Sequence, residues 1–233
     1  MPTCLIVNPN AGSASEMAAI RPSLEQLGEF PIWQTEGPGH AQELARNAAR
    51  EGYDYVIAAG GDGTLHEIVN GLLHAKYDGL IGILPIGTGN DLTRSIYEAH
   101  SDPQVLEVLT ARRWNWIDVG KIRLPGRELF FINASVLGFA AKLSRDLRAE
   151  VKKWMGSVAY PLAVLGELPE LESYSLEIKL DGGEPENFTV FNVTISNGEF
   201  LGGGILAAPQ ALLDDGKLDL FLFPEMPVVK GVN

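Results

Sequence analysis

The residues most able to do chemistry lie in the stretch AAGGDGTLHEIVNGL, residues 58 to 72. Gly60, Gly61 and Gly63 permit positive φ and let a ligand approach the main chain. The N–H groups of such a loop, with the positive end of a following helix, favour an anion such as phosphate. Asp62 would repel that phosphate unless a divalent cation lay between them, and Mg²⁺ usually binds through one or two carboxylates plus substrate oxygens. The stretch therefore predicts a metal–nucleotide site, with a tight turn stabilised by Asp62 as the alternative.

A second loop of the same kind follows at LPIGTGNDL, residues 84 to 92. Glycines, a hydroxyl, an amide and a carboxylate again come between an apolar segment and a helical start. Two such loops at the ends of successive parallel strands can face one crevice, which is where open α/β sheets bind ligands. Neither loop has the G-x-G-x-x-G or G-K-[ST] pattern, so a dinucleotide-binding loop and a P-loop are both disfavoured.

The helix after the first loop is expected to begin at Thr64. Thr64 fits an N-cap, and Glu67 completes a capping box three residues later. An apolar stripe at helical spacing predicts packing on a sheet; it consists of Leu65, Ile68, Val69, Leu72 and Leu73.

The elements that must position these loops alternate along the first hundred residues. Apolar runs TCLIVNP, FPIWQT, YDYVIAAGG and LIGILPIGTG read as strands. Between the second and third runs, HAQELARNAAREG carries alanines and Leu44 on one face and ends at Gly52, which predicts a helix. Residues 15–27 are also helix-like, with Pro22 kinking them or opening a new turn. This alternation predicts a parallel sheet with helices on its faces.

After about residue 120 the pattern becomes mainly β. RELFFINAS, SYSLEIKL, NFTVFNVTIS and KLDLFLF read as strands separated by the turn signals DGG, GGG and DDG, with one helical region over residues 140–168. We predict an α/β nucleotide-binding domain over residues 1–122 and a mainly antiparallel β domain for the substrate over residues 123–233.

Composition limits the partners and the compartment. A net charge of -12 and a pI near 4.8 oppose binding to nucleic acid and steady attachment to an anionic membrane. The single cysteine, Cys4, lies in an apolar run and is expected to be buried and inert. The chain has no signal-peptide pattern and no run of about 18 apolar residues, so we expect a cytoplasmic protein that does not span a membrane.

The two loops together give the chain its resemblance to a known family. GGDGTLHEIVNGL and PIGTGNDLTRS, preceded by Asn8, Gly12 and Thr35, resemble the diacylglycerol kinase catalytic-domain family, particularly its small soluble bacterial lipid kinases. Phosphofructokinases and NAD kinases carry stretches similar to GGDGT, and the second motif, PxGTxND, separates this chain from them. The resemblance continues through NASVLGF, GSVAY, SNGEFLGGG and APQALLDDG and covers nearly the whole chain.

This resemblance implies a fold and a set of ligands. The fold would be a Rossmann-like parallel-sheet domain, as in NAD kinases and phosphofructokinases, followed by an antiparallel β-sandwich-like domain. The cofactors would be ATP and Mg²⁺, with Asp62 meeting the Mg²⁺ and Gly87, Asn90 and Asp91 supporting the second loop. The residues implied in ATP binding are Asn8, Gly12, Thr35, Gly60, Gly61, Asp62, Gly63, Thr64, Leu65, His66 and Thr88.

The resemblance also implies a second, structural metal ion. It would be held by the carbonyls of Leu212 and Lys217 and the side chain of Asp215. Because Asp-Gly before KLDLFLF is by itself a hairpin signal, a turn without metal is the alternative.

The sequence departs from the family at its end. Relatives continue into a further strand and an acidic motif that contributes the proposed catalytic carboxylate, whereas this sequence stops at MPVVKGVN. We therefore expect a truncated chain or compromised activity, and the general base stays unassigned. The segment DGGEP at residues 181–185 lies between two strand patterns and is interpreted as a turn.

The favoured function is that of a kinase that transfers the γ-phosphoryl of ATP to a hydroxyl of a diacylglycerol-like lipid. It would meet the lipid in transient, peripheral contact with a membrane; no nucleic-acid partner is expected, and a homodimer is left open. Two alternatives stand: a kinase for a soluble hydroxyl substrate such as NAD, and a catalytically impaired nucleotide- or lipid-binding protein. For Lys152 to Met155 a solvated helix face is preferred to a membrane contact, and for the glycines 202–204 a turn is preferred to a cleft lining.

Overall fold

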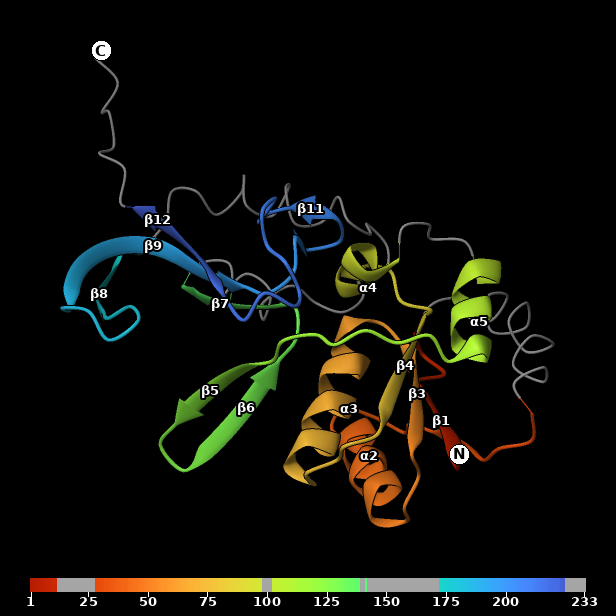
Figure 1. Cartoon of the computed structure of the whole chain (residues 1–233). Coiled ribbons are helices and arrows are strands. Elements are labelled where there is room, and N and C mark those ends of the chain that lie inside the picture. Colours follow the sequence, from red (N-terminus) through yellow and green to blue (C-terminus); the bar gives the residue numbers. More distant parts are fainter. Residues whose placement is uncertain (12–27, 98–101, 139–140, 142–171, 225–233) are drawn as a thin grey trace. The chain divides into compact units, whose positions relative to one another are not determined.

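The computed structural model describes residues 1–11, 28–97, 102–138, 141 and 172–224 (Figure 1). The chain forms two compact units. The first consists of Met1–Asn133 and Asn197–Lys217, and the second of Ala134–Ser196 and Leu218–Asn233. The prediction divided the chain once, between residues 122 and 123, whereas each observed unit is built from two segments.

A four-stranded parallel sheet forms the centre of the first unit, as the alternating pattern predicted. Its strands are β1 (Thr3–Val7), β2 (Ile32–Gln34), β3 (Tyr55–Gly60) and β4 (Leu80–Pro85), in the order β2-β1-β3-β4. In this register Val7 is opposite Gln34 and Ala59, and Gly60 is opposite Pro85. The carboxyl ends of all four strands therefore meet at one edge of the sheet.

Helices cover both faces of this sheet. On one face, side chains such as Cys4 and Ile6 pack with α2 (His40–Arg50) and α3 (Asp62–His74). On the other, Leu5 and Val7 pack with α5 (Asp102–Ala111). Figure 1 shows α2 and α3 side by side, next to the sheet. The alternation of β1 side chains between the two clusters is what a strand buried on both faces requires.

The predicted helical stripes are confirmed. Ala41, Ala45 and Ala48 of α2 are buried, as are Leu65, Ile68, Val69 and Leu72 of α3. Gly52, at φ 78°, follows the end of α2 in the left-handed conformation expected of it. The helix predicted over residues 15–27 lies outside the described residues.

A hairpin of β5 (Gly120–Leu124) and β6 (Arg127–Phe131) is joined to α3 by the buried amide of Asn70 and by the ring of His74, which lies 3.1 Å from the Glu128 carbonyl and edge-on to Phe130. Asn70 donates from Nδ2 to the Phe130 carbonyl, and its Oδ1 accepts the Phe130 N–H, each at 2.9 Å. The side chain thus bonds β6 as a neighbouring strand would. Residues predicted as the first strand of the second domain accordingly belong to the first unit.

The second unit contains an antiparallel sheet, as predicted. The long strand β9 (Glu186–Ser196) pairs with β7 (Ala134–Gly138), β8 (Tyr174–Ile178) and β12 (Asp219–Pro224). Between β8 and β9 the chain turns through Asp181 and Gly182, both at positive φ, and the Gly183 N–H donates to the Leu180 carbonyl at 2.8 Å. The DGGEP segment is therefore a turn.

Three other sequence predictions fall outside the described part of the chain. They concern GSVAY, Lys152 to Met155, and the helical region 140–168 apart from residue 141. Among the helices of the described residues, none has the length and apolar character that crossing a bilayer requires.

Candidate nucleotide and phosphate site

The residues predicted to bind the nucleotide follow the carboxyl ends of the four parallel strands. Asn8 comes directly after β1, and its N–H donates to the Ala59 carbonyl of β3 at 3.0 Å. Thr35 comes directly after β2, where its N–H donates to the Val7 carbonyl at 2.9 Å. The loops after β3 and β4 lie at the same edge. The parallel sheet thus brings together residues from four separate parts of the sequence, as expected for a ligand site in an open α/β fold.

The two glycine loops touch each other. The Ile86 N–H donates to the Gly60 carbonyl at 3.2 Å. A Cβ added to Gly87 would lie 2.3 Å from the Gly61 Cα, and one added to Gly60 would lie 2.5 Å from the Thr64 Cβ. Neither distance is compatible with a side chain. The absence of one at Gly87 allows the backbones of the two loops to touch, and its absence at Gly60 leaves room for the Thr64 side chain.

Positive φ is not the reason for the glycines of the first loop. The glycines at positive φ do not include Gly60, Gly61 or Gly63, so this part of the prediction is wrong. Gly63 differs from the other two because a Cβ there would meet no atom within 4 Å. Its freedom from neighbours leaves space in which a ligand can approach the first turn of α3.

The predicted capping box is also wrong. α3 begins at Asp62, with Gly61 as N-cap and no side-chain cap, because the DGT residues already adopt helical geometry. Thr64, the third residue of the helix, instead accepts a hydrogen bond at Oγ1 from Asn8 Nδ2 at 3.0 Å. Glu67 Oε1 accepts the Gly39 N–H at 2.8 Å and so fixes the loop before α2. The start of a helix, uncapped by any side chain, is suited to bind an anion.

Asp62 connects the two loops while keeping an exposed side chain. Its Oδ1 accepts the Asp91 N–H at 2.9 Å, at the start of the short helix α4 (Asp91–Ile96). Although Asp62 is exposed, the packed loops remove part of the water around its carboxyl, which raises the pKa. The neighbouring Asp91 raises the pKa further, and hydrogen bonds from three backbone N–H groups oppose the increase. A cation beside Asp62 would relieve this accumulation of negative charge.

The second loop is fixed by its own side chains. Asn90, at φ 52°, accepts the Gly87 N–H at 3.1 Å and donates to the Gly87 carbonyl at 2.6 Å. The buried carboxylate of Asp91 accepts the N–H groups of Gly203 and Gly204, at 3.0 and 2.7 Å. These two glycines belong to the turn between β10 (Phe200–Leu201) and β11 (Ile205–Leu206), which confirms the turn expected at residues 202–204.

The other residues implied in nucleotide binding differ in exposure. Thr88 and His66 are exposed, whereas Thr35 is buried. Partial loss of hydration around the ring lowers the pKa of His66, and Glu67 raises it by a smaller amount. Leu65 lies in the core and its N–H donates to the Gly61 carbonyl. Gly12 lies outside the described residues.

The residues present at the loop edge fit a divalent cation. A Cβ on Gly89 would lie 2.7 Å from Asp62 Oδ2, so the absence of a side chain keeps this oxygen accessible. Asp62 would hold the ion, and the ion would neutralise phosphate charge beside the first turn of α3. This arrangement suits positioning and charge stabilisation of a triphosphate more than covalent catalysis.

The turn predicted to hold a structural metal is attached to Asp118. The Gly216 N–H donates to Asp118 Oδ2 at 2.6 Å, and Asp215 Oδ1 accepts the Lys217 N–H at 3.0 Å. The Lys217 ammonium lies 3.5 Å from Asp215 Oδ2. Within the described residues no three acidic, histidine or cysteine side chains gather as a metal site. A set of two carbonyls and one carboxylate at Leu212, Asp215 and Lys217 stays a prediction.

Sequence reasoning missed three polar side chains that bond backbone groups within the first unit. Arg94 donates from Nε to the Gly89 carbonyl at 3.3 Å. Asn197 donates from Nδ2 to the carbonyls of Asp118 and Ile132, each at 3.0 Å, and Asn133 donates to the Phe200 carbonyl at 2.9 Å. The two asparagines stood in the quoted motifs NASVLGF and SNGEFLGGG, but their partners are far away in sequence and no local pattern identifies them.

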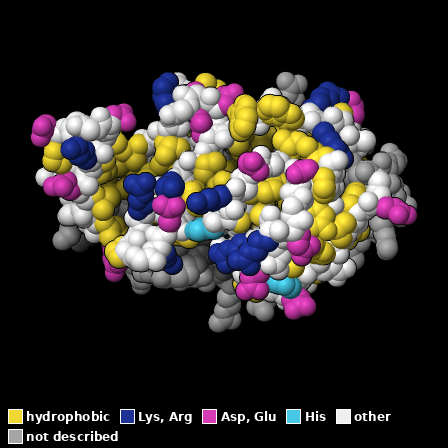
Figure 2. Space-filling view, turned by 60° about the horizontal axis from the view of Figure 1, so that its bottom comes forward, with side chains coloured by type: hydrophobic (Ala, Val, Ile, Leu, Met, Phe, Trp, Pro, Cys, Tyr) yellow, Lys and Arg dark blue, Asp and Glu magenta, His cyan; other side chains and the backbone are white. Residues whose placement is uncertain are grey.

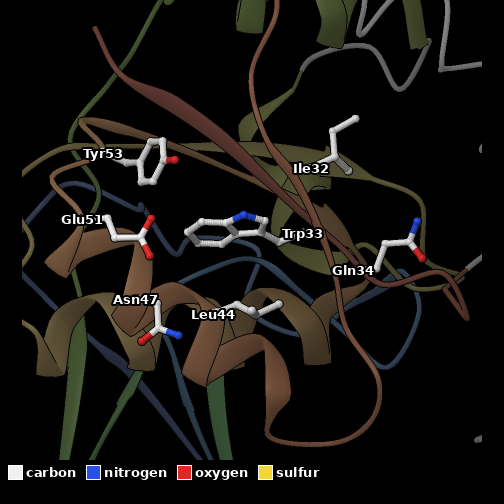
Figure 3. Close-up of a pocket in the computed structure, with 7 residues that line it drawn as sticks. All are labelled: Ile32, Trp33, Gln34, Leu44, Asn47, Glu51 and Tyr53. Carbon is white, nitrogen blue, oxygen red and sulfur yellow. The ribbon is translucent and has the colours of Figure 1, made fainter.

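A shallow cavity of about 540 Å³ lies elsewhere on the first unit (Figure 3). In it the Trp33 ring meets the Tyr53 ring edge-on, with centroids 5.5 Å apart. Its lining residues are Ile32, Trp33, Gln34, Leu44, Asn47, Glu51 and Tyr53. They include none of the residues predicted for the nucleotide, so we assign the site to the loop edge, where those residues converge.

Comparison with known proteins agrees with this geometry. The family model described as the diacylglycerol kinase catalytic domain matches residues 2–122, and that of the YegS C-terminal NAD kinase beta sandwich-like domain matches residues 135–230. A diacylglycerol kinase of Bacillus subtilis (strain 168) is 33% identical over 238 residues, which cover 98% of this chain and 76% of the relative. One from Staphylococcus aureus (strain MRSA252) is 30% identical over 223 residues, covering 94% and 69%.

A solved structure extends the similarity to the fold. The crystal structure of a diacylglycerol kinase from Bacillus anthracis str. Sterne superposes with a TM-score of 0.76 at 28% identity, covering 96% of this chain and 73% of that one. The predicted α/β fold, with a parallel-sheet domain and a separate antiparallel domain, is thereby confirmed. The chain belongs to the diacylglycerol kinase catalytic-domain family, and with it to the phosphotransferases.

Proposed function

We propose that this protein is an ATP- and Mg²⁺-dependent lipid kinase that phosphorylates a hydroxyl of a diacylglycerol-like lipid. The observation that carries the proposal is the contact between the two glycine loops at the carboxyl edge of the sheet, with Asp62 bonded to the start of α4. The relatives named diacylglycerol kinase support the choice of acceptor.

Each part of the edge has a role in this proposal. The first turn of α3 and the open space beside Gly63 receive the phosphates. Asp62 holds the Mg²⁺, which when bound spreads the charge of the transferring phosphoryl group. Asn90 and Asp91 hold the second loop in place, with Thr88 exposed on it. A base that accepts the lipid hydroxyl proton is also required, and no residue is assigned to it.

Transfer of radiolabel from γ-labelled ATP into a lipid extract tests the proposal. We expect Asp62→Asn to lower the rate by about a hundredfold or more, because the amide is a poor ligand for Mg²⁺. The fold should persist, since the amide oxygen can still accept the Asp91 N–H. Asp78→Asn is the matched control, because Asp78 is an exposed carboxylate just before β4, at the opposite edge of the sheet.

The result also separates the alternatives. Label in a soluble acceptor such as NAD, with none in lipid, would replace the lipid by a soluble substrate. Calorimetric binding of Mg-ATP without turnover on any acceptor would favour a catalytically impaired binding protein. Equal rates for wild type and Asp62→Asn would remove Asp62 from the site.

A further inference from the structure

Two tryptophans lie exposed on the segment between α5 and β5. We define residues 112–116, of sequence RRWNW, as the tryptophan segment. Trp114 is 58% exposed and Trp116 is 79% exposed. Their rings meet edge-on, with centroids 5.5 Å apart and planes at 82°. Asn115 separates the two tryptophans in the sequence, and both side chains are exposed to solvent.

Exposure alone does not mark a docking surface. Figure 2 shows hydrophobic side chains at the surface among charged ones, as on most proteins. Tryptophan is different because its indole joins a large apolar ring to one N–H donor, which suits the boundary between lipid chains and water. Two such rings in contact form one amphipathic unit larger than a single exposed leucine.

The tryptophan segment is held at both ends. At its start, the N–H groups of Arg112 and Arg113 donate to the carbonyls of Leu109 and Val108, both at 3.2 Å. After its end, Ile117 packs on the core of α2 and α3, and the Asp118 N–H donates to the Leu213 carbonyl at 2.6 Å. The backbone therefore presents the rings without having to be ordered on binding.

The charge around the rings is opposite to that of the whole chain. Residues 107–128 contain five basic side chains, Arg112, Arg113, Lys121, Arg123 and Arg127, and three acidic ones, Glu107, Asp118 and Glu128. Glu128 pairs with Lys121 at 3.0 Å and with Arg123 at 3.6 Å, so a net excess of two basic side chains remains. The Asp118 carboxylate accepts the Gly216 N–H, and Glu107 pairs with Arg113 at the surface. A local basic excess in a chain of net charge -12 favours an anionic lipid surface at this place.

The size of the apolar contact favours a bilayer over a protein. Each tryptophan buries roughly 150–250 Å² when fully covered. A stable protein interface needs about 800 Å² from each partner, which is more than this pair supplies. Partial insertion of amphipathic side chains beside basic residues suffices for reversible attachment to a membrane.

We propose that the tryptophan segment docks this protein on anionic bilayers, with Trp114 and Trp116 entering the headgroup region and the neighbouring basic side chains facing acidic lipid. The proposal rests on the proposed lipid kinase function, because it supplies the route to a membrane-borne substrate.

Flotation with lipid vesicles tests the docking without measuring catalysis. Wild type should float with phosphatidylcholine vesicles that contain phosphatidylglycerol, and less with phosphatidylcholine alone. Trp114→Ser/Trp116→Ser should bind at least about tenfold more weakly. Arg113→Gln should weaken binding up to about fivefold, and added salt should reduce that difference. Ile32→Ser, at a residue 52% exposed on β2, is the control and should bind like wild type.

Kinase assays distinguish this proposal from the proposed function. The double tryptophan variant should phosphorylate a short-chain diacylglycerol in free solution at the wild-type rate, and vesicle-borne diacylglycerol more slowly. A wild type that floats but phosphorylates no lipid would leave the docking standing and remove the lipid kinase function.

Two outcomes would overturn the docking. One is absence of wild-type flotation with anionic vesicles, or equal flotation of the double variant. The other is a change of oligomeric state in gel filtration of the double variant with unchanged flotation, which would assign the rings to contact between copies of this chain.

Discussion

At the scale of single residues, the glycines of the two loops are of two kinds: some have atoms packed where a side chain would be, and one faces open space. Gly61 and Gly87 allow the two loop backbones to touch and Gly60 leaves room for the Thr64 side chain, whereas Gly63 borders open space. From the sequence, the glycines of the first loop were expected to let a ligand approach the main chain. It did not distinguish the glycines with close neighbours from Gly63, which has none, because those neighbours lie partly in the other loop.

Alanine substitutions at Gly63 and Gly87 should therefore have opposite effects. Gly63→Ala should fold with unchanged or slightly raised stability, since alanine favours helix by up to about 1 kcal/mol, but bind Mg-ATP weakly because the new methyl occupies ligand space. Gly87→Ala should lose about 1–3 kcal/mol of stability, because its methyl meets the Gly61 backbone. Urea unfolding and calorimetry measure the two effects. Full Mg-ATP affinity in Gly63→Ala would contradict the assignment.

The reactivity of the Cys4 thiol reports whether the core around the first strand is closed. Cys4 is fully buried, and burial, with a smaller effect of Glu51, raises its pKa to about 12. Because the folded pKa exceeds the unfolded one, native Cys4 stays a thiol at pH 8, with a thiolate fraction of about 10⁻⁴. An aromatic disulfide reagent should therefore react with Cys4 only as the protein unfolds in guanidinium. The absorbance of the released aromatic thiolate measures the reaction. Rapid stoichiometric reaction of the native chain would show the first strand to be open.

At the scale of elements, the strands and the two amphipathic helices follow directly from periodicity. Runs such as TCLIV and YVIAAG and the stripes of α2 and α3 each carry their own pattern. The attachment of the β5–β6 hairpin to α3 had no such signal. It involves Asn70, a buried amide whose partner Phe130 lies sixty positions away, and His74, whose ring lies 3.1 Å from the Glu128 carbonyl.

Removing the Asn70 amide should weaken the attachment of the hairpin to α3, leaving the contacts of His74 with Glu128 and Phe130. Asn70→Ala leaves the Phe130 N–H and carbonyl without these partners, and we expect a loss of about 1–3 kcal/mol in the free energy of unfolding. Urea denaturation measures it, with Asn47→Ala as control because Asn47 is exposed on α2. Protection of the β6 amides from hydrogen exchange should also fall. Unchanged stability and protection would mean that other contacts hold the hairpin.

At the scale of the whole molecule, the sequence predicted the classes of both parts and the strand ends that would carry the site. Thr35, Asn8 and the two loops gather because parallel strands align their carboxyl ends, a general property of this fold class. The course of the chain between the units was not predicted. Local patterns identify strands, but they do not tell which sheet a strand joins, and the grouping of residues 197–217 with the first unit had no signal in the sequence.

A backbone hydrogen bond at Asn133 joins two points at which the chain passes between the units. The chain leaves the first unit after Asn133 and re-enters it at Asn197, whose N–H donates to the Asn133 carbonyl at 2.7 Å. Residues 134–196 thus begin and end at two positions of the first unit that a backbone hydrogen bond joins, and the chain passes into the second unit again after Lys217. Insertions or deletions inside residues 134–196 therefore need not move either attachment point.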